Sequence, residues 1–287
     1  MPTKAQRPRL NPQPGNGQVE QDEYMDEKTR THNLILLQSP LWILPVLYVM
    51  QTGILCAWSD IEYMAFSLAV ASPSLVFPAI FLHSASSSDT SKIPYYLKLN
   101  LWTFVLVIFG TYFGTHYFFD LMGMEYTFGD ACTWHLESDV LGQHGGNGTP
   151  RQVVPLFMYP LTHAYFMSYF CLLVTLEQKL RSVKFLKTTK LGNGLLLLGL
   201  SYGLAFAETY VMASPLLEDL FRYRDRERML RLGSLGYAAY FVVGLPMVKR
   251  IDRDAEWGLG RVIIEALGTS MGIMVLLEAW AKVVGPI

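Results

Sequence analysis

Long apolar segments dominate this chain. They recur between about residue 36 and residue 284, and most are long enough to cross a hydrocarbon core of about 30 Å as a helix. Of the 287 residues, 51% are hydrophobic and only 16% are charged, a balance typical of multispanning membrane proteins rather than of soluble domains. We therefore predict an all-α, polytopic membrane helix bundle of about seven transmembrane helices, near residues 36–57, 61–82, 97–119, 153–176, 191–214, 230–248 and 261–284.

The first 33 residues have a different composition, rich in Pro, Gln, Asn, Gly and charge. A segment of this kind cannot bury enough apolar surface to order itself. We predict a disordered N-terminal tail over residues 1–33 and one transmembrane domain over residues 34–287. Within that domain, Pro40, Pro45, Pro73 and Pro78 predict kinks in the first two helices.

Loop charges predict the orientation of the chain. Lys and Arg are dense after the fourth and sixth predicted helices and almost absent after the first and third. The positive-inside rule then places the N-terminus in the cytosol, although the Arg-rich loop before the sixth helix runs against it. The sequon Asn147-Gly148-Thr149 falls on the far side, as glycosylation requires.

Several classes of function lack their characteristic residues. A net charge of −1 provides no basic field for nucleic acid. Cys56, Cys132 and Cys171 are widely spaced, so they predict neither a disulfide framework nor a metal site. The sequence has no nucleophile elbow, HExxH, P-loop or GxGxxG motif, so hydrolases, metalloproteases and nucleotide-dependent enzymes are poor candidates. We predict no metal and no cofactor.

Titratable residues gather in one half of the predicted membrane region. A charged side chain at mid-bilayer costs about 2.5 to 3.5 kcal/mol on insertion scales, so each one needs a reason. Five of the seven predicted helices place such groups in the half away from the cytosol: Glu62, His116, Asp120, His163, Glu208 and Glu278. Glu208 lies about six residues, or ~9 Å, inside an apolar helix.

Helical spacing brings some of these groups onto shared faces. Tyr112, His116 and Asp120 follow the i, i+4, i+8 pattern, and Ser201, Ala205 and Glu208 form a stripe of small side chains ending in a carboxylate. We predict catalytic roles for Glu208, His116, Asp120 and Glu62. We predict substrate contacts for Tyr112, Tyr117, His163, Tyr237 and Tyr240.

Each of these residues also has a structural interpretation. Asp120 and Glu125 could be solvated residues at a helix exit, and Glu62 could be a first-turn acid favoured by the helix dipole. His116 and Glu208 could each make an interhelical hydrogen bond, and His163 could be a packing residue. The aromatic residues could belong to the core or to an interfacial belt. The sequence leaves these alternatives open.

A carboxyl group within an aromatic, apolar pocket suits one kind of chemistry. In a low-dielectric site it resists ionisation and can act as a proton donor. Aromatic faces stabilise positive charge by about 0.5 to 2 kcal/mol per well-placed ring. Such a pocket could protonate an unactivated carbon framework and protect the carbocation. We therefore favour isomerisation of a hydrophobic substrate over hydrolysis.

The residues themselves resemble the cycloeucalenol cycloisomerase family of cyclopropylsterol isomerases. The resemblance runs from about residue 34 to the C-terminus and is carried by the segments NLWTFVLVIFGTYFGTHYFFDLMGMEYTF (100–128), IEYMAFSLAVASPSLVFP (61–78), SYGLAFAET (201–209), RLGSLGYAAYFVVGLPMVKRID (231–252) and EWGLGRVIIEALGTSMG (256–272). The loop over residues 129–152 departs from the family pattern, being longer and richer in His and Gly.

The resemblance implies opening of the 9β,19-cyclopropane ring of cycloeucalenol to give obtusifoliol. A proton is delivered to C19, positive charge develops at C9, and a base removes the proton at C8, so no cofactor is consumed. The implied partners are a sterol taken from the bilayer and membrane lipids, and the implied compartment is the endoplasmic reticulum for a eukaryotic source. Two alternatives stay open: a sterol Δ8–Δ7 isomerase, and a non-catalytic sterol-binding or transport membrane protein.

Overall fold

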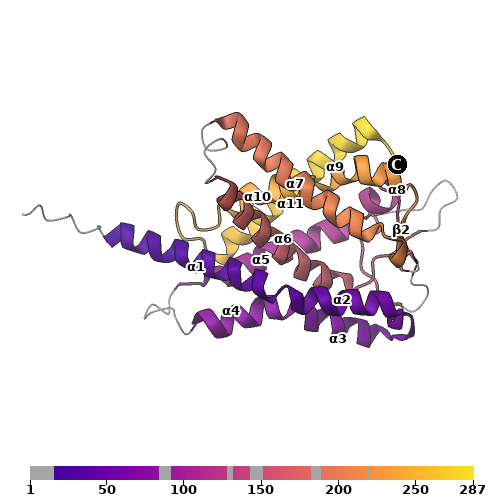
Figure 1. The fold of residues 1–287 in the computed structure, drawn as a ribbon, viewed down its shortest axis with the longest axis horizontal. Helices are drawn as coiled ribbons and strands as arrows, with labels where there is room; N and C mark the ends of the chain where they lie inside the picture. Colours follow the sequence, from indigo (N-terminus) through magenta and orange to yellow (C-terminus); the bar gives the residue numbers. More distant parts are fainter. Residues whose placement is uncertain (1–15, 84–91, 128–131, 143–150, 182–188, 219) are drawn as a thin grey trace, which may run out of the picture.

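The structure is a bundle of long helices (Figure 1). It is a computed structural model and describes residues 16–83, 92–127, 132–142, 151–181, 189–218 and 220–287. Within these ranges, six helical segments are long and apolar enough to cross a membrane: Met25–Thr52, Asp60–Leu82, Tyr95–Phe113, Lys190–Met212, Arg226–Val248 and Leu259–Val284. The chain is therefore an integral, multi-pass membrane protein, as its composition predicts.

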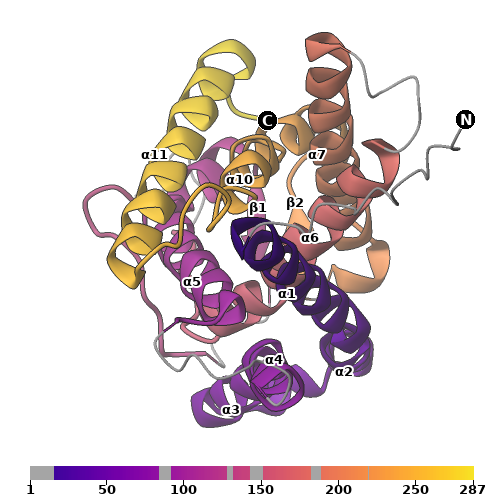
Figure 2. The same cartoon turned by 90° about the vertical axis from the view of Figure 1, so that its left-hand side faces the viewer.

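The fourth predicted helix is present but is not among those six segments. Helix α6 (Met158–Arg181) is 24 residues long and begins five residues later than the sequence indicates. It packs against α1, α3, α5, α7 and α10, and Figure 2 shows it in the middle of the bundle. Because its neighbours shield it from lipid, α6 can carry more polar residues than the helices around it.

The N-terminal part corrects the prediction of a disordered tail. Helix α1 (Asn16–Gln38) already covers residues 16–33, and residues 1–15 lie outside the described ranges. The helix is held by specific contacts: the His32 Nε2 atom lies 2.8 Å from the Tyr95 hydroxyl, and Glu27 accepts a 2.9 Å hydrogen bond from the Tyr95 backbone N–H. These tertiary contacts order a segment whose composition alone would leave it unfolded.

Two prolines divide the first two predicted helices. Helix α2 (Pro40–Thr52) begins at Pro40, and a break at Ser72 separates α3 (Asp60–Ala71) from α4 (Pro73–His83). Pro45 and Pro78 lie inside their helices. A short 3₁₀ turn, η1 (Ile54–Ala57), joins α2 to α3.

The remaining helices follow the predicted order with local irregularities. Helix α5 (Tyr95–Phe113) continues into a π-helical turn, η2 (His116–Leu121). Helix α7 (Lys190–Met212) is regular and is followed by the 3₁₀ turn η4 (Pro215–Leu217). The sixth predicted helix is divided into α8 (Arg226–Arg228), the π-helical turn η5 (Met229–Gly233), α9 (Ser234–Tyr237) and α10 (Ala239–Val248). The last helix is α11 (Leu259–Val284).

A small cap covers one end of the bundle. Its centre is an antiparallel pair of strands that the sequence did not indicate, β1 (Met124–Tyr126) and β2 (Phe221–Tyr223), with Glu125 opposite Arg222. The carboxylate of Asp60, at the start of α3, accepts hydrogen bonds from the backbone N–H groups of Thr133 and Trp134 at 2.9 and 3.1 Å. The sequon at residues 147–149 lies outside the described residues.

Close approach between helices depends on small residues, as is usual in membrane bundles. Trp102 of α5 meets Phe170 of α6 edge to face, with ring centroids 5.1 Å apart. A Cβ atom on Gly244 of α10 would lie 2.6 Å from the Phe170 ring. Only glycine therefore lets α10 approach α6 at this point.

A buried ion pair ties the opposite end of the bundle together. Lys98 Nζ lies 2.7 Å from Asp252 Oδ2, and the two side chains are only 1% and 2% exposed. Asp252 also accepts a hydrogen bond from the Trp257 backbone, and Lys28 donates to the Ile251 carbonyl. The cluster joins α1, α5 and the α10–α11 connection, at the end of the molecule away from β2 (Figure 1).

We predict that Asp252→Asn destabilises the protein by about 3 kcal/mol, because it leaves the buried Lys98 ammonium without its main counter-charge. Asparagine keeps the side-chain shape and tolerates the positive φ of 51° at this position. Unfolding in detergent should show the change. Asp254→Asn, in the exposed pair with Arg253, is the control and should change stability much less, because solvent screens an exposed pair. Equal effects of the two variants would contradict the assignment.

Candidate active site

A cavity of about 670 Å³ lies between the helices, below the cap. That volume is within the roughly 300 to 1,000 Å³ typical of sites for small organic ligands. Its walls come from α2, α3, α5, η2, α6, α7, α9, α10 and both strands of the cap, and most of its lining side chains are aliphatic or aromatic. The cavity is suited to a rigid hydrophobic molecule with few polar groups.

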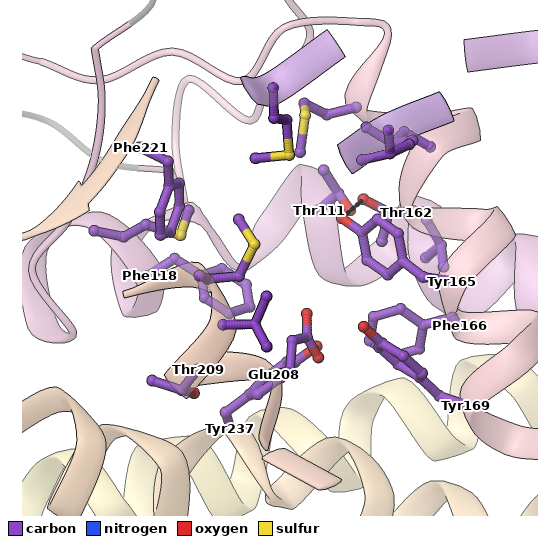
Figure 3. Close-up of a pocket in the computed structure, with 18 of the residues that line it drawn as sticks. Thr111, Phe118, Thr162, Tyr165, Phe166, Tyr169, Glu208, Thr209, Phe221 and Tyr237 are labelled. Atoms are coloured by element: carbon purple, nitrogen blue, oxygen red, sulfur yellow. Dashed lines mark hydrogen bonds between the residues drawn. The ribbon is translucent and has the colours of Figure 1, made fainter. Parts of the chain in front are cut away.

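Glu208 of α7 projects into this cavity (Figure 3). Among the lining residues in the described part of the chain, it is the only one with a carboxyl group, and none of the others is His, Lys or Arg. The Tyr237 hydroxyl donates a 2.6 Å hydrogen bond to Glu208 Oε2. Tyr169 is a second hydrogen-bonding neighbour of the same carboxyl group. The polar chemistry of the cavity is therefore concentrated at this carboxyl group.

Small residues allow Glu208 to occupy this position. Ala205 and Ser201, one and two turns earlier on α7, are fully buried against neighbouring helices, as the small-residue stripe predicts. The packed side of α7 therefore holds the helix close to α6, α9 and α10. Glu208 is the side chain at the cavity end of that stripe.

Aromatic rings form the wall around the carboxyl group. Phe118 of η2 stacks on Tyr240 with centroids 5.9 Å apart, and Phe166 of α6 meets Tyr240 edge to face at 5.8 Å. Figure 3 shows Phe118, Phe166 and Tyr169 around Glu208. Ring faces of this kind can stabilise a cation that forms inside the cavity.

The cavity is partly open to the outside. Two of its lining residues, Leu47 of α2 and Val211 of α7, are also 37% and 52% exposed. Both belong to helices that are apolar enough to cross a membrane. The opening therefore includes residues on the apolar outer surface of the membrane-spanning helices.

The structure brings three of the nine predicted site residues to the cavity, namely Glu208, Tyr237 and Tyr240. His116 and Asp120 do share a face, as their spacing predicts, with Nδ1 and Oδ2 2.8 Å apart. That face is not part of the lining, and the His116 side chain is 48% exposed. The lining residues of α5 and η2 are instead Leu106, Val107, Gly110, Thr111, Phe118 and Phe119, on a different side of the helix.

Glu62 and His163 also lie outside the cavity lining. Glu62 forms a capping box at the start of α3, where it accepts hydrogen bonds of 2.7 Å from both the backbone N–H and the hydroxyl of Ser59. The His163 Nε2 atom lies 3.0 Å from Asn100 Oδ1 on α5. Both residues thus have the structural contacts that their alternative interpretations require.

The two remaining predicted tyrosines face other neighbours. Tyr112 packs edge to face on Phe113, with centroids 4.8 Å apart. Tyr117 donates a 3.0 Å hydrogen bond to Glu278 of α11. Burial, helped by that carboxylate, raises the pKa of Tyr117 to about 12, so its phenol stays protonated at neutral pH. Neither tyrosine belongs to the cavity lining.

The lining residues with hydroxyl groups that the sequence prediction missed include Thr111, Thr162, Tyr165 and Tyr169. The last three share a helical face with the same i, i+3, i+7 periodicity as the neighbouring face that includes His163. Periodicity shows which residues lie together on a helix, but it does not show which face meets the cavity. The periodicity of α6 was therefore visible in the sequence, but it did not identify this face as the one that lines the cavity.

Comparison with known proteins provides independent support for the sequence resemblance. The chain is 32% identical over 262 residues to the Arabidopsis thaliana protein named cycloeucalenol cycloisomerase, and the match covers 88% of this chain and 85% of the relative. The chain belongs to the cycloeucalenol cycloisomerase family. No protein-family model matches the sequence, and no solved structure gives a significant match, so this family assignment rests on the full-length relative.

Membership of this family makes the environment of Glu208 the feature to test first. No group of three or more His, Cys, Asp or Glu residues that could hold a metal ion occurs in the ranges described. The residues around Glu208 can hold a proton, orient it and surround a positive charge. They place one carboxyl group inside a largely aromatic and aliphatic cavity.

Infrared spectroscopy can test the hydrogen bond to Glu208 directly. Glu208→Gln should remove a carboxyl band that is present in the infrared spectrum of the wild type. Tyr237→Phe should shift that band to higher frequency, because the carboxyl group loses the 2.6 Å hydrogen bond that the Tyr237 hydroxyl donates. Tyr210→Phe on the same helix is the control, since Tyr210 is 57% exposed and does not line the cavity. If Tyr237→Phe leaves the band in place, the geometry described for Glu208 is wrong.

Proposed function

We propose that this protein is a cycloeucalenol cycloisomerase, which opens the 9β,19-cyclopropane ring of a 4α-methylsterol to give the Δ8-sterol. The observation that carries the proposal is a single carboxyl group, Glu208, facing a largely apolar and aromatic cavity open to the outside. The named relative supports the reaction class. The substrate is a sterol drawn from the surrounding lipid, and for a eukaryotic source the compartment is the endoplasmic reticulum membrane.

Glu208 is the proton donor in this proposal. Its carboxyl proton is transferred to C19 while the electron pair of the C9–C19 bond forms the new C19–H bond. Positive charge then develops at C9. The electron pair of the C8–H bond forms the C8=C9 double bond, and the departing proton needs a base.

The carboxylate of Glu208 is also the base in this proposal. Once it has given up its proton, it is the acceptor at hand among the lining residues described, and C8 and C19 are both bonded to C9. One carboxyl group can therefore serve both atoms in turn. Each turnover restores its proton and consumes no cofactor, as an isomerisation requires.

The neighbours of Glu208 have separate roles. Tyr237 and Tyr169 orient the carboxyl group by hydrogen bonding. Phe118 and Phe166 present aromatic surface to the cavity and stabilise the cation at C9 by about 0.5 to 2 kcal/mol each. The apolar walls exclude water, which would otherwise capture the cation.

The proposal predicts that Glu208→Gln lowers kcat for ring opening by about 10² to 10⁴-fold, the range typical of a general acid–base group. Glutamine keeps the shape of the side chain but has no acidic proton. Purified protein in detergent should be incubated with cycloeucalenol and the sterols separated by gas chromatography. Glu227→Gln, in an exposed pair with Arg231, is the matched control and should keep wild-type activity. Near wild-type turnover by Glu208→Gln would remove Glu208 from the mechanism.

The catalytic roles that the sequence predicts for His116 and Asp120 can be tested separately from this mechanism. Because the pair does not line the cavity, we expect Asp120→Asn to lower kcat less than tenfold. A loss as large as that of Glu208→Gln would bring the pair back into the proton path. Glu62→Gln, which breaks the capping box, should act on stability rather than on kcat.

The same site could protonate an alkene, so a sterol Δ8–Δ7 isomerase is the second candidate. The carboxyl group and the aromatic wall are common to both reactions, and only the substrate differs. Incubation with cycloeucalenol and with a Δ8-sterol separates them by which compound is converted. Sterol binding without conversion of either compound would indicate a transport function instead.

A further inference from the structure

A second polar centre lies on the wall of the same cavity. Thr111 of α5 and Thr162 and Tyr165 of α6 all belong to the lining, and Figure 3 shows the three side chains together, on the side of Glu208 opposite Thr209 and Tyr237. The Thr162 and Tyr165 hydroxyl oxygens are 3.0 Å apart. Two helices thus bring three hydroxyl groups to one point of an otherwise apolar surface.

The hydrogen-bonding capacity of this centre is not used up. The contact between Thr162 and Tyr165 uses one hydroxyl proton, so one of the two groups still has a proton to donate. The Thr111 hydroxyl has no hydrogen-bond partner among the residues described. A ligand hydroxyl placed here could therefore both accept and donate.

Several other polar groups on the cavity wall are already engaged. Ser39 and Ser168 hydrogen bond to each other at 2.8 Å, and Trp42 donates to Ser168 at 2.8 Å. Thr209 donates to the Ala205 carbonyl at 2.8 Å, and the Tyr63 hydroxyl donates to the Leu55 carbonyl. The Tyr240 hydroxyl also has no hydrogen-bond partner among the residues described, but it is a single group. Thr111, Thr162 and Tyr165 bring three hydroxyl groups together, so they are better placed to both donate to and accept from a polar group of a ligand.

We propose that Thr111, Thr162 and Tyr165 form the subsite that binds the 3-hydroxyl group of the sterol. This inference rests on the proposed function, because it assigns the orientation of the sterol in that reaction. A cyclopropylsterol has one hydroxyl, on the ring that also carries C10, to which C19 is bonded. The hydroxyl subsite must therefore lie near the proton donor, and Tyr165 is close enough to Glu208 to interact with it electrostatically.

The two polar centres, the three hydroxyl groups and Glu208, together set the orientation of the substrate in the cavity. With its hydroxyl held by Thr111, Thr162 and Tyr165, the sterol presents the cyclopropane side of its ring system to Glu208. The hydrocarbon skeleton then extends along the aliphatic and aromatic surface of the cavity. Tyr112 and Tyr117, for which the sequence predicts substrate contacts, take no part in this assignment, since neither residue lines the cavity.

Paired ligands with and without the hydroxyl test this subsite. Affinities for cycloeucalenol and its 3-deoxy analogue should be measured by displacement of a fluorescent sterol from the full chain in detergent. We expect the wild type to prefer the hydroxylated compound by about tenfold or more, because the analogue leaves buried hydroxyl groups unpaired. In Thr162→Val and Tyr165→Phe, the preference should fall to about twofold or less.

Thr209→Val is the matched control. It makes the same change elsewhere in the same cavity, but its hydroxyl already donates to its own helix, so the preference should remain at the wild-type value. A third variant, Thr111→Val, tests whether the hydroxyl group that α5 contributes takes part in the subsite. Size-exclusion profiles and circular dichroism confirm that the variants fold.

The outcomes separate this inference from the proposed function. Equal affinity of the wild type for the two ligands, or an unchanged preference in Thr162→Val and Tyr165→Phe, would overturn the subsite even if the ring is opened. A preference for cycloeucalenol over its 3-deoxy analogue that is lost in the variants supports the subsite, whether or not turnover is seen. Absence of ring opening by the wild type would instead contradict the proposed reaction.

Discussion

The cost of placing Glu208 within an apolar helix is the constraint on which the rest of the site depends. A carboxyl group there has little water to hydrate it, so its neighbours must provide hydrogen bonds. Tyr237 provides one at 2.6 Å and Tyr169 is close by, from two different helices. The packing of α6, α7 and α9 around one another is thus coupled to the environment of a single titratable group.

Two departures from regular helix shape this environment. The π-helical turn η2 follows α5 and places Phe118 and Phe119 at the cavity, while His116 and Asp120 lie on another side. The second π-helical turn, η5, precedes α9, which carries Tyr237. Such turns are frequent at functional sites because the extra residue re-aims the side chains that follow. Both turns lie near the cap, whose strands close one end of the cavity.

The sequence predicted the positions of most helices well, but it predicted poorly which face of each helix lines the cavity. Apolar length predicted the helices, and proline predicted the breaks at Pro40 and Pro73, because both signals act locally. The α1 segment was misjudged because its order comes from contacts with residues distant in sequence, such as Tyr95. For the site, insertion cost identified Glu208, whereas shared helical faces did not distinguish Thr162, Tyr165 and Tyr169 from their neighbours on α6.

By itself, the sequence determined that the chain enters a membrane as a helical bundle, that it carries a carboxyl group where lipid would not tolerate one, and that it resembles sterol isomerases. These properties follow from composition, from local spacing and from similarity along the chain. Only the tertiary structure decided which helical faces meet, since the rotation of each helix about its axis depends on packing against partners far away in sequence. That packing set Glu208, Tyr237 and Tyr240 on one cavity and placed His116 and Asp120 outside it.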